Sequence, residues 1–342
     1  MTRCLVAEIA NSLLLLAAAT VCYNSASQNE DALSGEATLA SIRIGTRGSR
    51  LARWQAEWVA AELTRQGHAV ELITIATRGD ISTASLRDVG GQGLFTKEIQ
   101  RAVISNQVDL AVHSLKDLPT LPIEGLTLAA VPPRETTADC LLSRSGADFE
   151  RLPAGATVGT GSSRRGAQLL AWRPDVVISD IRGNVESRIR KMHEGLYDAI
   201  ILAKAGLTRL QLTEQVTQTL PQSKILPAIG QGALGLECRE EDSQTRSALE
   251  QLNCPSSYAA VAAERSLLLS LLAGCLAPVA ALGHIADSGE LELTAGVFSV
   301  DGKRVVRGTL RGERIDATKI GAELAEALKR QGADELIDAA RR

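Results

Sequence analysis

Apolar and polar positions alternate along the chain with two different periods, which predicts strands followed by helices. The apolar run at 70–75 has the length of a buried strand. Before it, Leu51, Trp54, Trp58 and Ala61 recur at three- and four-residue intervals, which predicts a helix with these residues on its apolar face. Strands that alternate with helices favour an α/β unit with a mainly parallel sheet.

The same alternation begins again beyond a proline-rich crossover. Apolar runs at 157–158, 176–178 and 198–202 predict strands, and the segments 163–172 and 185–194 between them have helical spacing. Two similar α/β units in tandem predict a cleft between domains, which is a common place for a ligand.

The last part of the chain has a different order of elements. A helix is expected at 258–272, followed by a strand at 291–295 and by a hairpin whose turn is Asp301–Gly302. A helical region begins at Ala317. The glycine-rich segment 227–236 is interpreted as a hinge that returns the chain to the first unit.

These patterns predict two tandem α/β domains of periplasmic-binding-protein-like type with an inter-domain cleft, plus a small C-terminal α+β domain. The expected boundaries are 41–134 with 230–250 for domain 1, 135–229 for domain 2 and 251–342 for domain 3. Residues 1–40 are set apart as an extension of uncertain status. They loosely resemble a secretory signal, but a misassigned start codon explains them better, and their apolar core is too short to span a bilayer.

Composition narrows the classes of function. Among 342 residues the net charge is −3 and only 3% are aromatic, which argues against a base-stacking platform and against a surface that binds polyanions in general. No pair of cysteines has C-x-x-C spacing and only four histidines occur, so we expect no metal site and free thiols in a reducing compartment. The cysteines are at positions 4, 22, 140, 238, 254 and 275.

Four loops that follow predicted strands carry basic and small polar side chains, as ligand loops in α/β sheets do. Guanidinium forks bind planar anions in a bidentate manner, and neighbouring glycines let backbone N–H groups approach an anion. A single surface arginine is ordinary, but the set predicts a site for a polycarboxylate or a phosphate. The residues are Arg47 and Ser49, Lys116 and Asp117, Arg164 and Arg165, and Arg182 and Arg188.

Two further residues could perform chemistry. An aspartate among arginines should stay ionised at neutral pH, so Asp117 could stabilise a cation or exchange a proton with an ammonium group; the alternative is a cap on the turn at 118–119. Cys275 stands between Gly274 and Pro278 in the apolar stretch LLAGCLAPVA. Taken alone, such a thiol is more often inert packing than a reactive group.

Several motifs, in order, closely resemble the porphobilinogen deaminase (hydroxymethylbilane synthase) family across 41–342. They are RIGTRGS (43–49), VGGQGLFTK (89–97), AVHSLKDLP (111–119), VGTGSSRR (158–165), IRGNV (181–185) and PAIGQGA (227–233), with Glu264–Arg265, Gly274–Cys275 and Pro278.

The resemblance implies a transferase that joins four porphobilinogen molecules head to tail, with release of ammonia, to give hydroxymethylbilane in tetrapyrrole biosynthesis. It implies a dipyrromethane cofactor held by a thioether to Cys275. It also implies a cytoplasmic monomer whose product passes to uroporphyrinogen-III synthase, with no nucleic-acid or membrane partner. Every pyrrole ring of the growing chain carries an acetate and a propionate, and binding of these carboxylates would explain the clustered arginines.

By this resemblance Asp117 contacts pyrrole N–H groups, assists the loss of ammonia and stabilises the azafulvene cation that forms. Arg209 would help to bind incoming substrate, and Phe95 would stack on a ring. The carboxylates of cofactor and growing chain would be bound by Arg47, Ser49, Lys116, Thr160, Ser162, Arg164, Arg165, Arg182 and Arg188.

The sequence departs from the common family pattern at Gln92, Gly161, Ser163, Ala273 and Ala277, none of which has a named chemical role. The competing hypothesis is a solute-binding module for a small organic anion, because two α/β lobes with a hinge and a cleft would suit it. An anion receptor has no need of an acid in an arginine cleft or of a thiol at its mouth, so Asp117 and Cys275 favour the enzyme.

Overall fold

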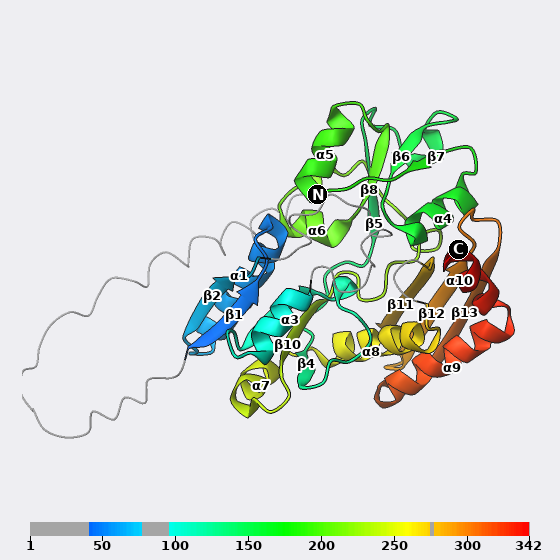
Figure 1. Cartoon of the computed structure of the whole chain (residues 1–342). Coiled ribbons are helices and arrows are strands. Elements are labelled where there is room, and N and C mark those ends of the chain that lie inside the picture. Colours follow the sequence, from blue (N-terminus) through cyan, green and yellow to red (C-terminus); the bar gives the residue numbers. More distant parts are fainter. Residues whose placement is uncertain (1–40, 77–95, 274–276, 342) are drawn as a thin grey trace, which may run out of the picture. The chain divides into compact units, whose positions relative to one another are not determined.

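The computed structural model describes residues 41–76, 96–273 and 277–341. These residues form two five-stranded sheets and one three-stranded sheet, with helices on their faces (Figure 1). The predicted fold class, two tandem α/β units and a smaller α+β unit, is therefore confirmed. The N-terminal extension 1–40 lies outside the described residues.

The first sheet has the strand order β2-β1-β3-β10-β4. Strand β1 pairs in parallel with β2 and β3, whereas β10 lies between β3 and β4 and is antiparallel to both. Four strands thus run one way and β10, which returns from much later in the chain, runs the other. The strands are β1 (Ile42–Thr46), β2 (Val70–Thr74), β3 (Leu110–Ser114), β4 (Leu126–Ala130) and β10 (Leu234–Arg239).

Helices cover both faces of the first sheet. Side chains of a strand alternate between faces, so Leu110 and Val112 pack with α1 and α7, while Ala111 between them packs with α3. The helices are α1 (Arg50–Arg65), α3 (Lys97–Ile104) and α7 (Ser243–Glu250).

The face that α1 buries differs from the predicted one. Its buried residues are Gln55, Ala56, Val59 and Leu63, whereas Ala61 is exposed and the two tryptophans are only partly buried. The prediction included both tryptophans, but the helix turns Ala56, Val59 and Leu63 to the sheet, with Trp58 partly buried against the same core. Trp54 is consequently free to line a surface pocket.

The second sheet repeats the plan of the first, with the order β7-β6-β8-β5-β9 and β5 antiparallel to both of its neighbours. Helix α4 packs on one face, and α5 and α6 pack on the other. The strands are β5 (Asp139–Ser143), β6 (Thr157–Gly159), β7 (Val177–Ser179), β8 (Ala199–Ala203) and β9 (Gln218–Thr219). The helices are α4 (Ser163–Trp172), α5 (Val185–His193) and α6 (Lys204–Arg209).

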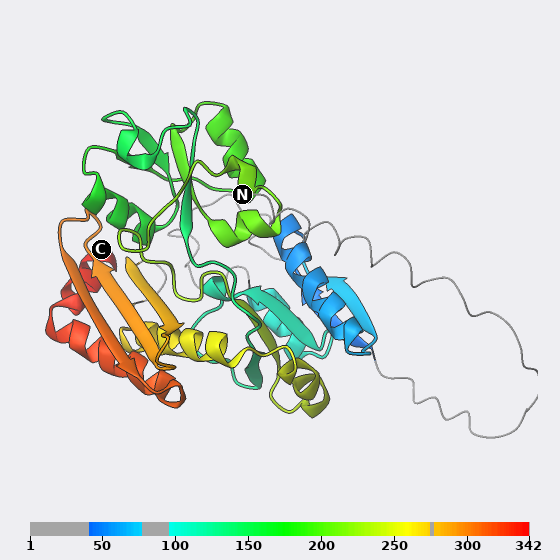
Figure 2. The ribbon, with the colours of Figure 1, turned by 180° about the vertical axis from the view of Figure 1, so that it is seen from behind.

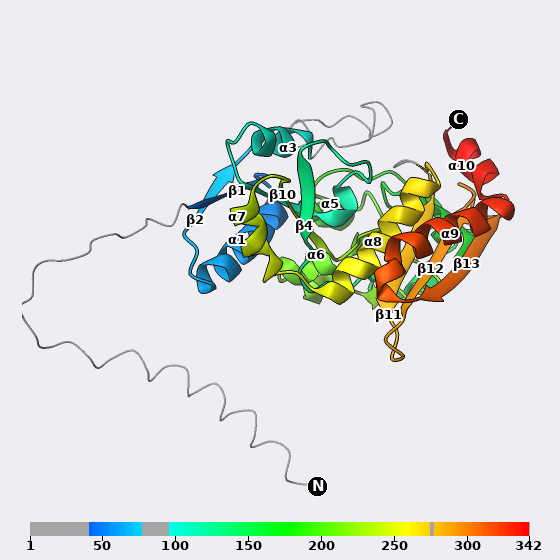
Figure 3. The same cartoon turned by 90° about the horizontal axis from the view of Figure 1, so that it is seen from below.

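The third sheet is the antiparallel meander β11-β12-β13. Helices α8, α9 and α10 share one core with it (Figure 3). The opposite face, seen in Figure 2, meets α4 where Ala167 shares a small core cluster with Ala280 and Phe298. The elements are β11 (Val279–Ile285), β12 (Leu291–Phe298), β13 (Val305–Gly312), α8 (Pro255–Ser270), α9 (Ala317–Arg330) and α10 (Ala333–Arg341).

Candidate active site

Arg47 and Ser49 follow β1 directly, on the loop that leads into α1. Ser49 is the N-cap of α1, and its Oγ accepts a hydrogen bond from the backbone N–H of Ala52 over 3.3 Å. A serine at this position satisfies one of the free N–H groups of the first helical turn. The cap therefore fixes the path of the loop that presents Arg47.

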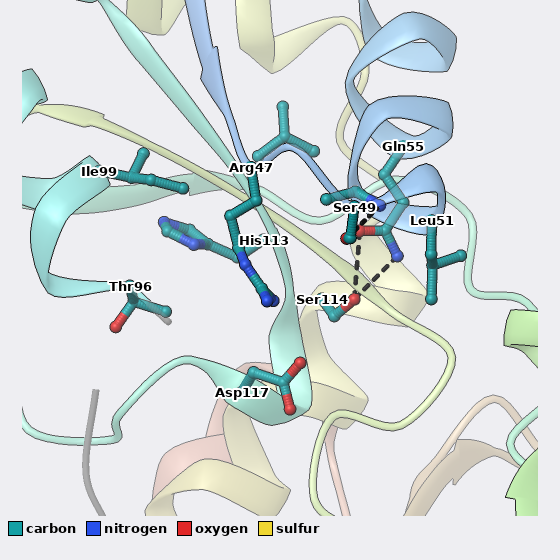
Figure 4. A pocket seen from close by; sticks show the side chains of 11 residues that line it. Arg47, Ser49, Leu51, Gln55, Thr96, Ile99, His113, Ser114 and Asp117 are labelled. Atoms are coloured by element: carbon teal, nitrogen blue, oxygen red, sulfur yellow. Dashed lines mark hydrogen bonds between the residues drawn. The ribbon is translucent and has the colours of Figure 1, made fainter. Parts of the chain in front are cut away.

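Arg47, Ser49, Gln55, His113 and Asp117 line one pocket. Figure 4 shows Arg47 and Asp117, from different segments, pointing toward the same space. Gln55 and Ser114 hydrogen-bond to each other, with the Gln55 amide donating over 2.8 Å. This bond joins α1 to the end of β3 and so connects the two segments that carry Arg47 and Asp117.

A short 3₁₀ turn, Leu115–Asp117, carries Lys116 and Asp117 beyond β3. Leu115 is buried and both charged side chains are exposed. Surrounding protein still removes enough hydration from the ammonium to lower the pKa of Lys116 to about 8; Arg164 and Arg165 add to this, while Asp117 and Asp139 oppose it. Lys116 therefore belongs to the same electrostatic cluster as the arginine pair of α4.

Arg164 and Arg165 lie in the first turn of α4, as predicted, but both guanidinium groups are buried and paired with Asp139. Arg164 Nη1 donates to Asp139 Oδ2 over 2.8 Å, and Arg165 Nη2 donates to Asp139 Oδ1 over 2.7 Å. Burial alone would raise the pKa of Asp139, but the two arginines offset this and hold the pKa well below its usual range. Sequence reasoning missed Asp139, although an acidic residue at the start of the otherwise apolar strand β5 was a usable signal.

Asp139 does not use the full donor capacity of the pair. Arg164 Nε is buried and has no hydrogen-bond partner among the residues that the structure describes. A buried polar atom without a partner is rare in a native protein and often marks a ligand site.

The polar residues after β6 shape the start of α4. Ser162 is its N-cap and accepts from the backbone N–H of Arg165 over 3.4 Å, and Thr160 Oγ accepts from the backbone N–H of Ser162 over 3.2 Å. Both predicted residues thus help to position the arginine pair.

Arg182 and Arg188 come from the next loop and from α5. Arg182 Nε donates to Asp180 over 2.9 Å, and Arg188 Nε donates to the carbonyl oxygen of Gly183 over 2.8 Å. Burial, assisted by Arg165 and Arg182, lowers the pKa of Arg188 to about 10, and Asp117 acts in the opposite direction. The charges of Arg188, Arg165 and Asp117 therefore influence one another, although they come from α5, α4 and the turn after β3.

Arg209 ends α6 and points back to the glycine-rich segment. Its Nη2 donates to the carbonyl oxygen of Gly232 over 2.7 Å, and burial lowers its pKa to about 10. Phe95 and Cys275, the predicted stacking residue and the predicted cofactor attachment point, lie outside the described residues.

A second group that sequence reasoning missed is a buried pair beside the pocket. His113 Nε2 lies 2.9 Å from Glu237 Oε2, and the Gln100 amide donates to both carboxylate oxygens over 3.1 Å. His113 follows the apolar residues of β3 and Glu237 interrupts the apolar run of β10. These unlike neighbours in two paired strands were the available signal.

The described thiols differ in reactivity. Burial raises the pKa of Cys140 to about 12 and that of Cys238 to about 11, so both should be inert. Partial burial opposes ionisation of Cys254, but hydrogen bonds from Ser257 outweigh it and lower the pKa. Within 41–76, 96–273 and 277–341 there is no group of three or more potential metal-ligating residues, and no helix there is long and apolar enough to cross a membrane.

Two family models match the chain in succession. Residues 42–247 match "Porphobilinogen deaminase, dipyromethane cofactor binding domain", and residues 258–330 match "Porphobilinogen deaminase, C-terminal domain". The chain belongs to the porphobilinogen deaminase family. The resemblance seen in the sequence motifs is confirmed, and the competing solute-binding hypothesis is not favoured.

Curated relatives agree with this assignment. Porphobilinogen deaminase of Geobacter sulfurreducens is 48% identical over 86% of this chain and 93% of its own length, and that of Geobacter metallireducens is 49% identical over 86% and 93%. Among solved structures, a periplasmic substrate-binding protein from Coxiella burnetii covers 61% of this chain and 92% of its own, with a TM-score of 0.38 and 16% identity. Similarity at that level carries no argument about the ligand.

The residues of the site fit the dipyrromethane cofactor that the family model names. The hydrogen-bond donors among the described residues are arginine, lysine, serine and threonine side chains, and these are the donors expected around a group that bears several carboxylates. The carboxylate of Asp139 is already paired with Arg164 and Arg165. The buried Arg164 Nε adds donor capacity that Asp139 does not take up.

Proposed function

We propose that this chain joins four porphobilinogen molecules head to tail, with release of ammonia, and that Asp117 is its catalytic residue. The observation that carries this assignment is the position of Asp117 in a pocket with Arg47, Ser49 and Gln55. A carboxylate there can face a substrate cation while neighbouring donors hold the substrate's own carboxylates.

Each condensation breaks the bond between the aminomethyl carbon and nitrogen of porphobilinogen, and the ammonium group leaves as ammonia. The cation left on the substrate is stabilised by the Asp117 carboxylate. When bound, the dipyrromethane supplies the nucleophilic pyrrole carbon that forms the new carbon–carbon bond. The proton that this carbon would lose balances the step, and we propose that the Asp117 carboxylate would accept it.

Binding of carboxylates is assigned to the basic and hydroxyl residues around Asp117. Arg47 and Ser49 serve the pocket itself, and Arg209 serves the incoming substrate. Phe95 is proposed to stack on a ring, and Cys275 to hold the cofactor through a thioether. The remaining carboxylate-binding residues are proposed to be Lys116, Thr160, Ser162, Arg164, Arg165, Arg182 and Arg188.

The experiment is a comparison of Asp117→Asn with Asp117→Glu. The amide removes the negative charge, so we expect ammonia release to fall by about a hundredfold or more, whereas glutamate should retain part of the rate. Near-normal ammonia release by Asp117→Asn would refute the role.

The covalent attachment has its own test, the intact mass of the purified protein. We expect a surplus of two linked pyrrole units, absent in Cys275→Ser. A wild-type chain of unmodified mass from a porphyrin-making host would overturn the attachment.

We further propose the domain boundaries 41–134 with 230–250, 135–229, and 251–342, which the division of the described strands into three sheets supports. A monomeric, cytoplasmic enzyme that passes its product to uroporphyrinogen-III synthase is the corresponding cellular proposal. Size-exclusion chromatography with light scattering checks the monomer.

A further inference from the structure

A second cavity, of about 420 Å³, adjoins the loop that presents Arg47 and Ser49. Its lining includes Gly48 of that loop, four residues of α1 and Arg209 at the end of α6. A volume of this size is in the range that holds small ligands. Because Gly48 lies between two residues of the catalytic pocket, the two cavities meet at one loop. The α1 residues are Arg50, Arg53, Trp54 and Glu57.

Two of its arginines form long, exposed ion pairs, and Arg50 Nη2 also donates to the carbonyl oxygen of Leu210 over 3.4 Å. Arg53 Nη2 lies 3.5 Å from Glu57 Oε1, and Arg50 Nη1 lies 3.6 Å from Glu186 Oε1, with both arginine side chains 62% exposed. Such pairs contribute little free energy because water competes for both charges. A ligand carboxylate can therefore replace them and gain a bidentate contact.

Two other lining residues, Arg209 and Trp54, are held by contacts within the protein. The guanidinium carbon of Arg209 lies 5.9 Å from the centroid of the Trp54 ring, and Arg209 is anchored on the carbonyl oxygen of Gly232. Trp54 is available to this cavity because α1 buries Ala56 and Val59 instead. The cavity thus combines an apolar ring, exposed guanidinium groups and one carboxylate, that of Glu57.

We propose that this cavity is a waiting site for the next porphobilinogen molecule, an inference that rests on the proposed function. Porphobilinogen carries an acetate, a propionate and an aminomethyl group that is protonated at neutral pH. Arg50 and Arg53 match the carboxylates, Glu57 matches the ammonium, and Trp54 matches the pyrrole ring. The linear product has no amine, so Glu57 selects the substrate over the product.

A waiting site has a definite kinetic signature. It raises the local concentration of substrate beside the catalytic pocket, and this advantage disappears when substrate is saturating. Loss of the site therefore raises KM and leaves kcat unchanged.

The kinetic test compares Arg53→Ala and Glu57→Gln with a matched pair elsewhere. We expect each to raise the KM for porphobilinogen by about threefold, and Arg50→Ala combined with Arg53→Ala to raise it by about tenfold. Arg190→Ala and Glu194→Gln are the controls, because Arg190 and Glu194 form a similarly exposed pair at 3.6 Å at the C-terminal end of α5. An unchanged KM in the Arg53 and Glu57 variants would overturn the proposal.

Direct binding separates the role of each charge without turnover. The probe is a pyrrole with the same acetate and propionate but with methyl in place of aminomethyl, titrated calorimetrically into the full-length wild-type chain and its variants. Arg53→Ala should weaken its binding by about threefold, whereas Glu57→Gln should leave it unchanged. Equal weakening by both variants, or by neither, contradicts the assignment.

The two proposals fail in different ways. If the wild-type chain releases no ammonia from porphobilinogen, the proposed function is wrong. If the wild-type chain releases ammonia normally, but the Arg53 and Glu57 variants have the same KM as the Arg190 and Glu194 controls, then the waiting site is wrong and the proposed function stands. Thermal unfolding of each variant excludes loss of fold as the cause, and Arg53→Lys should recover part of the KM effect.

Discussion

The side-chain amide of Gln231 donates a hydrogen bond to Asp139 Oδ1 over 2.8 Å, although the two residues are 92 positions apart. The same amide nitrogen donates to the carbonyl oxygen of Thr137 over 2.8 Å. Gln231 is fully buried. One side chain therefore connects the segment that enters the second sheet with the segment that leaves it. It does so beside the single carboxylate, that of Asp139, with which both arginines pair.

Asp139→Asn should be strongly destabilising, because it leaves Arg164 and Arg165 buried without a counter-charge. Removing one partner of a buried ion pair typically costs about 3–5 kcal/mol, and we expect a loss of this size in urea unfolding. Asp338→Asn, which breaks an exposed pair with Arg341, is the control and should change little. A loss in Asp139→Asn no greater than in the control would mean that another group neutralises the arginines.

Gly232→Ala tests the close approach of two backbone segments. A Cβ at Gly232 would lie 2.3 Å from the carbonyl oxygen of Glu135, whereas Gly289 has the same φ of +86° with no atom within 4 Å of the added Cβ. Alanine at either position pays about 1–2 kcal/mol for a left-handed conformation. We expect Gly289→Ala to lose only that much in urea unfolding, and Gly232→Ala to lose clearly more. Equal losses would contradict the importance of the contact.

The lowered pKa of Lys116 predicts that the KM for porphobilinogen rises at alkaline pH. Its pKa of about 8 lies below the ordinary value, so the ammonium is charged below pH 8 and loses its charge as the pH rises through 8. If it binds carboxylates as proposed, KM should rise between about pH 7 and pH 9. Lys116→Arg keeps its charge over this range and should flatten the profile. A profile that is the same in both chains would assign the rise in KM to another group.

Thiol labelling should rank the described cysteines. Cys140 and Cys238 are buried with raised pKa values, and Cys254 is partly exposed with a lowered one. With iodoacetamide at neutral pH, peptide mapping should find Cys254 alkylated well before the other two. Cys254→Ser should leave the mass surplus of the proposed cofactor intact. Rapid labelling of Cys140 would show that the second sheet opens.

Much of the fold follows from local pattern. The helix predicted at 163–172 coincides with α4, because a serine cap and glycine-flanked loop define its start. Less accurate was the face of α1, where Gln55 is buried by its bond to Ser114. That contact depends on another segment, and no periodicity within α1 reveals it.

The site was predictable in its residue types but not in its pairings. Ligand loops in α/β sheets follow strands, and this pattern identified Lys116, Asp117 and the arginine pair, because each follows a strand in its own segment. The pattern could not reveal that Asp139 faces both arginines, because that contact joins β5 to the first turn of α4. Nor could it reveal that Glu237 faces His113, because that contact arises from the pairing of β3 with the distant strand β10.

The place of β10 has a consequence for how the molecule is made. This strand fills the gap between β3 and β4, yet it leaves the ribosome only after every strand of the second sheet. Until β10 has been synthesised, the facing edges of β3 and β4 therefore remain unpaired. Unpaired strand edges can form wrong pairs with other strands. The second sheet can close during that interval, so the part of the enzyme that begins first along the chain is completed later than its neighbour.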